Sequence, residues 1–557
     1  MKNGKLTALL TVGLTASLLM ASCVKQEEDI FSKNTLKCAE EASNAQVFGD
    51  SIVLGERLNN PYSVQNMQAA YNQVMATRGE MDGLTLQPNL LYVRFLPKDS
   101  ADVVFLRESG LELFDHPLDY DIVVIGDSYH DPSLPDTAFT WQYTCVKPDF
   151  TFPDMTYEVI EECFVPDEET SSTRAGFDWD EVEEAAFRNA DLPEKYLQHD
   201  TSTTRASASQ KKCPYGTLTL RDDYRVESWP IKGAKIRCHS FVKICTTHTD
   251  GNGHYEMTKS FSGKTYFSII YDNIKGFGIW ENNMFLSSAV HNFGDREWNF
   301  SKTVNENDGK WVLAVINTAA YEYYEMCKSE GINLPPNDLK ISCFKGTDGM
   351  TSAPMLQHLV GFSFAGIGID ATLETVLGTI CPALVCGQLL LAAASPDITI
   401  GGYTSKQDKY GMIYANTWHE LTHSSHFSKV GEIYWGQFIN FSVKSKIING
   451  TAYGNASSIS TGHYLCELAE SWAYANEKYI YKKMPVKRMK DDDIQIAGFY
   501  NWMKPSATAI YSILTAGILT RGEIYQCLTP DVKSINDLKN KLYATYPDKK
   551  SRIERYF

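Results

Sequence analysis

The chain has 557 residues, which is enough for about three domains of ordinary size. Hydrophobic residues make up 43% of the sequence, so substantial apolar cores can form. The formal net charge is -16, because 68 acidic residues outnumber 52 basic ones. A chain this acidic offers no basic stripe that would displace counterions from phosphates, and we therefore expect no nucleic-acid partner.

The first 22 residues have the pattern of a secretory signal peptide. Lys2 and Lys5 precede an apolar stretch over 6–20, which is too short to cross a membrane comfortably. The run Leu-Met-Ala-Ser-Cys that ends at Cys23 resembles a bacterial lipobox. This resemblance implies removal of residues 1–22 and lipidation of Cys23, while ordinary cleavage that leaves Cys23 unmodified is the alternative.

The residues directly after Cys23 combine one lysine with three acidic residues in the order Val-Lys-Gln-Glu-Glu-Asp. They resemble the surface-export tether of bacterial surface lipoproteins, although a solvated flexible leader has the same composition. The implied location is lipid-anchored on the outer membrane at the cell surface, with the periplasmic face as the alternative. The membrane would then be a partner only through the lipid on Cys23.

From 23 to 165 the sequence predicts a mixed α/β region. The runs over 90–95 and 121–125 are rich in β-branched and aromatic residues, as strands are. The segment 166–211 is predicted to be a linker, because Ser/Thr-rich stretches flank one short acidic helix over 178–188.

From 212 to 300 the pattern changes to short strands. A strand over 229–236 is followed by a Thr-Asp-Gly-Asn-Gly turn at 249–253 and by an aromatic strand over 265–271. This order resembles the carboxypeptidase-regulatory-like module, a small transthyretin-like β-sandwich. A calcium loop is the alternative for the acidic turn, but the later bidentate glutamate of an EF-hand is missing. We therefore expect a tight hairpin turn.

Helical periodicity begins at Trp311 and ends at a glycine stop signal, Gly331. A short strand over 339–343 follows. A second strand, over 397–402, is a plain sheet strand or a strand that pairs with an extended substrate backbone. The next predicted helix begins near Tyr410.

The run over 376–394 is apolar enough to pass a hydropathy test for a membrane span. Pro382 and Gln388 interrupt it, and the chain already has a predicted lipid anchor. We therefore interpret this run as a buried core helix.

The helix that begins near Tyr410 carries His-Glu-x-x-His at His419, Glu420 and His423. Residues four apart lie on one helical face, so both imidazoles can reach one ion at about 2.0–2.1 Å. Glu420 lies about 100° round the helix from His419, beside the pair, where it can take a proton from attacking water. Zinc would make that water acidic, lowering its pKa from about 15.7 to about 7. We predict a Zn2+ centre with Glu420 as general base; ordinary helix histidines are the alternative.

The type of the third zinc ligand distinguishes the zincin families. Metzincins have a further histidine where this chain has Lys429. Gluzincins use a glutamate from a second helix, and Glu470-Ser-Trp-Ala resembles the Glu-Gly-Phe-Ala segment of gluzincin aminopeptidases. The resemblance implies that Glu470 is the third ligand, with Glu467 as the alternative. The interval after His423 is longer than in that family, so 434–460 is expected to form an insertion.

Four other side chains near these motifs are candidates for supporting roles. His426, one turn beyond His423, is expected to support the ligands or to pack, not to bind metal. His463, Tyr474 and Tyr500 are candidates for donating a hydrogen bond to a transition-state oxyanion, and the sequence does not single one out.

Thirteen cysteines include no Cys-x-x-Cys spacing, so no zinc ribbon is indicated. Cys238 with Cys245, or Cys381 with Cys386, are close enough in sequence to pair in an exported protein. Their connectivity stays open.

The sequence thus predicts a multidomain α+β protein. Its parts are a signal peptide over 1–22, an α/β region over 23–165, a linker over 166–211, a β-sandwich over 212–300 and a zincin-like domain over 301–557. The predicted activity is zinc-dependent hydrolysis of a peptide or protein substrate. A surface adhesion or glycan-associated binding lipoprotein with a degenerate zincin domain is the alternative. In a latent form of the enzyme, residues 24 to about 205 would cover the cleft until the linker is cut.

Overall fold

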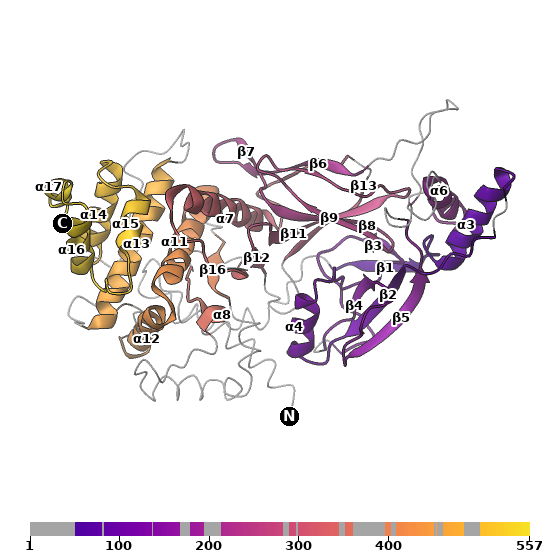
Figure 1. Cartoon of the computed structure of the whole chain (residues 1–557), viewed down its shortest axis with the longest axis horizontal. Coiled ribbons are helices and arrows are strands. Elements are labelled where there is room, and N and C mark those ends of the chain that lie inside the picture. Colours follow the sequence, from indigo (N-terminus) through magenta and orange to yellow (C-terminus); the bar gives the residue numbers. More distant parts are fainter. Residues whose placement is uncertain are drawn as a thin grey trace.

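The computed structural model has a mixed α/β architecture with multidomain character (Figure 1). The described residues form four sheets and twelve helices, which confirms the coarse fold class. The signal peptide, Cys23 and the run over 376–394 lie outside the described residues. None of the described helices is long and apolar enough to cross a membrane. The described residues are 51–80, 83–135, 138–166, 179–193, 196, 213–281, 289–296, 299–344, 351–359, 396–402, 408–449, 453, 460–483 and 502–557.

The N-terminal region combines two small antiparallel sheets with three helices and has its own hydrophobic clusters. One sheet pairs β1 with β3, and the other has the order β4-β2-β5. Both strands predicted from the sequence are present, as β2 and β3. The elements are β1 (Val53–Arg57), α3 (Val64–Thr77), β2 (Leu90–Leu96), α4 (Ser100–Glu108), β3 (Tyr120–Val124), β4 (Gln142–Val146), β5 (Thr156–Cys163) and α6 (Trp179–Asn189).

Helix α6 is the acidic helix that the sequence predicted, but it is not an exposed linker helix. Trp179 is buried and stacks on Tyr71 of α3 at 5.7 Å. Glu183 is also buried, and it accepts hydrogen bonds from Tyr62 at 2.7 Å and Lys243 at 2.6 Å. Helix α6 therefore belongs to the core of the N-terminal region; the Ser/Thr-rich stretches beside it lie outside the described residues.

Residues of the two larger sheets and of the C-terminal helices share a single extended hydrophobic core. The seven-stranded sheet has the order β16-β15-β12-β11-β8-β9, with β13 also paired to β11. The four-stranded sheet has the order β10-β6-β14, with β7 paired to β6. Its strands are β6 (Tyr215–Asp222), β7 (Glu227–Pro230), β10 (His254–Glu256) and β14 (Lys302–Val304). Those of the larger sheet are β8 (Ala234–Ser240), β9 (Lys243–His248), β11 (Thr265–Asn273), β12 (Phe277–Trp280), β13 (Val290–Arg296), β15 (Leu339–Phe344) and β16 (Ile398–Gly401).

The strand predicted over 229–236 is divided into β7 and β8, which belong to different sheets. The chain turns at Gly233, whose φ is +65° and where a Cβ atom would lie 2.6 Å from the ring of Tyr321. The predicted turn at 249–253 is present, because Asp250 accepts hydrogen bonds from the backbone of the residues that follow it. However, β10 pairs with β6 and not with β9, so this turn connects the two sheets and closes no hairpin.

The boundary predicted at residue 300 falls inside both of the larger sheets. In the seven-stranded sheet β15 runs parallel to β12, with Ile341 opposite Ile279, and β16 runs parallel to β15. In the other sheet β14 runs parallel to β6. Strands from both sides of the boundary therefore share one core, and the transthyretin-like identity of the β unit stays a prediction.

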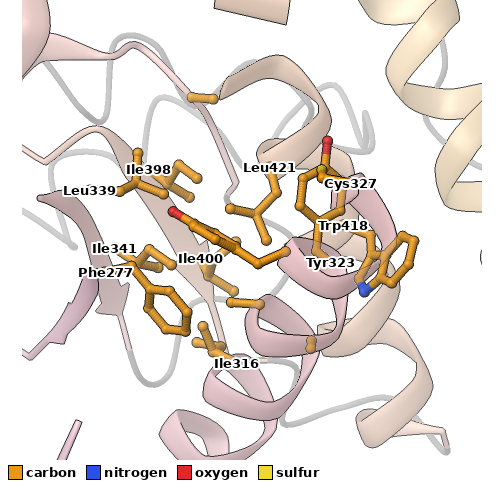
Figure 2. Packing of buried hydrophobic residues seen from close by; sticks show 14 of the residues in the cluster. Phe277, Ile316, Tyr323, Cys327, Leu339, Ile341, Ile398, Ile400, Trp418 and Leu421 are labelled. Carbon is orange, nitrogen blue, oxygen red and sulfur yellow. The ribbon is translucent and has the colours of Figure 1, made fainter. Parts of the chain in front are cut away.

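Helices α7 and α11 pack on the parallel part of the larger sheet (Figure 2). Tyr323 of α7 meets Trp418 of α11 edge to face at 5.2 Å, and Leu421 lies beside them near Ile400 of β16. Leu421 is about 160° round the helix from His423, so the histidine face of α11 turns away from this core. The helices here are α7 (Trp311–Glu330), α8 (Leu356–Leu359), α11 (Lys409–Val430), α12 (Glu432–Asn449), α13 (Thr461–Lys483), α14 (Lys504–Thr515), α15 (Arg521–Cys527), α16 (Ile535–Thr545) and α17 (Lys550–Ile553).

Seven of the described cysteines are free thiols: Cys145, Cys163, Cys238, Cys245, Cys327, Cys466 and Cys527. Cys238 and Cys245 lie directly opposite each other on β8 and β9, so they are neighbours without being bonded. Cys381 and Cys386 lie outside the described residues.

Candidate metal centre

Helix α11 starts at Asp408, a buried N-cap whose carboxylate accepts a hydrogen bond from the backbone N–H of Gly411 at 2.8 Å. The guanidinium of Arg225 binds the same carboxylate through two hydrogen bonds of 2.7 and 2.6 Å. Arg225 also binds Asp222 at 3.0 Å, and Tyr481 of α13 donates to Asp408 at 2.8 Å. This buried network joins α11 and α13 to the four-stranded sheet.

Three donor side chains from α11 and α13 converge at the predicted site. The Nε2 atoms of His419 and His423 lie 3.2 Å apart. Each lies 3.4 Å from an oxygen of Glu470, His419 from Oε2 and His423 from Oε1. Ligands held about 2.0–2.1 Å from a tetrahedral zinc ion lie about 3.3–3.4 Å from one another. The three side chains that the sequence predicted to converge do so, and one ligand atom from each lies within 4.8 Å of the others, so the group could hold a metal ion.

The orientation of His419 is fixed by a second carboxylate. Its Nδ1 atom lies 3.0 Å from Oε2 of Glu477, two turns beyond Glu470 on α13. A carboxylate is an acceptor, so it favours the tautomer in which Nδ1 carries the proton and Nε2 presents its lone pair to the site. Glu477 was not predicted from the sequence, although it lies seven residues after Glu470 and therefore on the same face of the helix.

Replacing Glu477 by alanine is expected to weaken zinc binding by about 10- to 100-fold, because His419 loses the partner that sets its tautomer and ring orientation. Competition with a chelating dye measures this affinity. Glu432→Ala, which removes an exposed carboxylate at the start of α12, is the matched control. Equal affinities in the two variants would show that Glu477 does not support the site.

Glu470 is held in its ionised form. Burial alone would raise its pKa, but the imidazoles of His423 and His419 outweigh burial and lower this pKa below the ordinary value. The hydroxyl of Tyr453 donates a hydrogen bond of 2.5 Å to Oε1 of Glu470. Glu467, the alternative ligand, instead accepts a hydrogen bond of 2.6 Å from Ser506 of α14. Among the described residues, the group of possible metal ligands contains Glu470 and not Glu467.

Glu420 is fully buried beside the three donors. No described side chain makes a well-oriented hydrogen bond to either of its oxygens. Burial raises its pKa, while the neighbouring His419 and His423 and the Thr351 hydroxyl offset part of that shift. Glu420 lines a pocket together with His423 and Glu470. A buried carboxylate without a well-oriented hydrogen bond is costly, and such groups concentrate where they act on a bound molecule.

The outer edge of β16 is already occupied in the described chain. Ser352 and Thr399 exchange two backbone hydrogen bonds, of 3.1 and 2.8 Å. An extended substrate therefore cannot pair with β16 at Thr399, as the sequence analysis considered. The segment 352–354 instead forms part of the pocket wall, and Trp435 of α12 holds it by donating to the carbonyl of Ala353 at 3.3 Å.

The other candidates from the sequence have separate surroundings. His426 is fully buried against Tyr434 and Trp435, no described residue partners either ring nitrogen, and burial lowers its pKa to about 3, so it packs as a neutral ring. His463 stacks on Trp502 at 4.0 Å. Tyr474 meets the ring of His419 edge to face at 4.6 Å. Tyr500 lies outside the described residues.

The N-terminal region does not cover this pocket. None of its described residues lines the pocket, and in Figure 1 it lies to the right of α11 and α13, with α4 near the middle of the view. The latent form predicted from the sequence would thus have to use residues outside 51–166 and 179–193.

Comparison with known proteins does not assign the chain to a family. No model of a known protein family matches the chain, and no curated protein matches its sequence significantly. What the site can do is therefore inferred from its own residues.

Proposed function

We propose that this protein is a zinc-dependent hydrolase that cleaves peptide bonds. The observation that supports this function best is the spacing of 3.2 to 3.4 Å among three buried donors, His419, His423 and Glu470. Two imidazoles and one carboxylate are a typical ligand set of catalytic zinc sites, which keep a further position open. Beside them, Glu420 offers a carboxylate to which no described side chain makes a well-oriented hydrogen bond.

Each residue has a distinct task in this proposal. His419, His423 and Glu470 hold the zinc, and Glu477 fixes the first imidazole. Zinc in this position would polarise the scissile carbonyl and acidify water at neutral pH. Glu420 accepts the proton from the attacking water and passes it to the leaving amine. Its burial supports this role, because the raised pKa brings the carboxylate closer to the pH at which it must both take and release a proton.

The proposed place of action is outside the cytoplasm. The pattern of residues 1–29 supports a lipid anchor at Cys23 on the outer membrane, exposed at the cell surface or on the periplasmic face. The partners are then peptides or proteins present there.

Digestion of a mixed peptide pool tests the proposal. The full mature chain is expected to generate new peptide termini, to lose this activity with a zinc chelator, and to regain it when zinc is added back. Mass spectrometry of the products provides the measurement. A pool left intact by zinc-loaded protein would exclude the peptidase and favour the binding lipoprotein with a degenerate site.

A further inference from the structure

The pocket beside Glu420 has an apolar wall that comes from the segment between the two metal-binding helices. Phe438 and Ile439 of α12 line it, with Ser442 one turn further along. The ring of Phe438 stacks between His423, at 6.3 Å, and Tyr453, at 6.4 Å. The wall therefore lies directly against the metal ligands.

The opposite wall is also uncharged. It is formed by Ser352, Ala353 and Pro354, and the backbone pairing of Ser352 with β16 fixes its position. The hydroxyl of Ser442 is already within hydrogen-bonding distance of Cys466, 3.7 Å from its sulfur. The hydroxyl therefore already has a hydrogen-bonding partner inside the protein and does not need one from a ligand.

The carboxylates that line the pocket already have other roles in the proposed site. Among the described residues that line it there is no lysine or arginine that could bind an acidic side chain. Its two carboxylates belong to Glu420 and Glu470, the proposed base and ligand, so neither is available to pair with a basic side chain. A charged side chain in this pocket would be desolvated without a partner, which is strongly unfavourable.

We infer that this pocket selects an uncharged, apolar side chain on the substrate residue next to the cleaved bond, and that α12 is the element that sets this specificity. The inference rests on the proposed peptidase function and adds the class of substrate. It also gives the insertion over 434–460 a role, because Phe438, Ile439 and Tyr453 all come from it.

Peptides that differ at a single position test the inference. With leucine, aspartate or lysine next to one scissile bond, the leucine peptide is expected to be cleaved at least about 100-fold more efficiently than either charged one. Ser442→Asp should reverse the order in favour of lysine, because it places a carboxylate in the apolar wall. Ile433→Asp adds the same charge at an exposed position of α12 and should leave the order unchanged.

A second variant tests the inference if Ser442→Asp does not fold, and a binding measurement tests it without relying on cleavage. Ile439→Ala should widen the pocket and shift the preference from leucine towards phenylalanine. Fluorescence anisotropy with the full-length Glu420→Gln protein should show tighter binding of the leucine peptide than of the charged ones. Equal binding of the three peptides, or binding of none, overturns the inference. Cleavage without the leucine preference also overturns it but leaves the peptidase function standing, whereas absence of any cleavage counts against the function.

Discussion

Replacing Glu420 by glutamine is expected to keep the metal bound and to reduce peptide hydrolysis by about 100- to 10,000-fold, the usual contribution of a general base. The amide has nearly the same shape as the carboxylate, but it cannot accept a proton. His419, His423 and Glu470 are unchanged in this variant, so the zinc content should match that of the wild type. The measurements are kcat/KM on one peptide and metal analysis of the same preparation.

Glu467→Gln is the matched control for this variant. Glu467 lies one turn from Glu470, but it bonds to Ser506 and is not in the group of possible metal ligands among the described residues. Its replacement should leave kcat/KM within a few fold of the wild type. A Glu420→Gln protein that still cleaves peptides at the wild-type rate would remove Glu420 from the proposed chemistry.

Replacing Arg225 by methionine is expected to lower the free energy of unfolding by about 3–5 kcal/mol. Asp222 and Asp408 are buried, and Arg225 is the cation that neutralises both. Without it two carboxylates stay desolvated, and the N-cap of α11 loses its partner. Since Tyr481 of α13 shares the Asp408 carboxylate, zinc affinity should fall as well. Denaturant unfolding and chelator competition measure the two effects.

Arg221→Met, in strand β6 just before the turn that carries Arg225, is the control for that experiment. Arg221 pairs with Asp223 at 3.3 Å in a partly exposed position, and such pairs contribute about 0–1 kcal/mol. Similar destabilisation by the two substitutions would mean that the buried network does not anchor α11.

The local parts of the site could be predicted from the sequence because their signals are local. The His-Glu-x-x-His spacing fixes a helix face, and Glu470 lies in a helix with its own apolar stripe. Strand β15 and helix α7, with Gly331 in the left-handed conformation at its end, also follow from short patterns. Glu477 could have been predicted in the same way, because its position relative to Glu470 follows from helical geometry.

The parts that could not be predicted depend on pairing between distant segments. The parallel pairing of β12 with β15 joins strands separated by the whole of α7, and the pairing of β15 with β16 joins strands separated by residues 345–397. Similarly, the edge of β16 is filled by Ser352, which nothing in the strand's own sequence indicates. Helix α6 was assigned to a linker because its sequence is acidic. Its apolar face packs on α3, and that contact between distant segments could not be predicted from the sequence.

Tyr453, which lies at the site itself, also could not be predicted from the sequence. Its hydroxyl reaches Glu470 from the segment between α12 and α13, where no periodic pattern gives its direction. With 31 tyrosines in the chain, residue type alone does not single it out. Only the folded arrangement brings Phe438 and Tyr453 into one wall beside His423.

Zinc analysis of two isosteric variants decides whether His419, His423 and Glu470 hold a metal. The wild type and Glu467→Gln are expected to bind about one zinc per chain with equal affinity. Glu470→Gln should lose affinity by more than the roughly 10- to 100-fold expected for removing an outer carboxylate. Loss of zinc in Glu467→Gln with retention in Glu470→Gln, or a wild-type protein that binds none, would contradict the proposed centre.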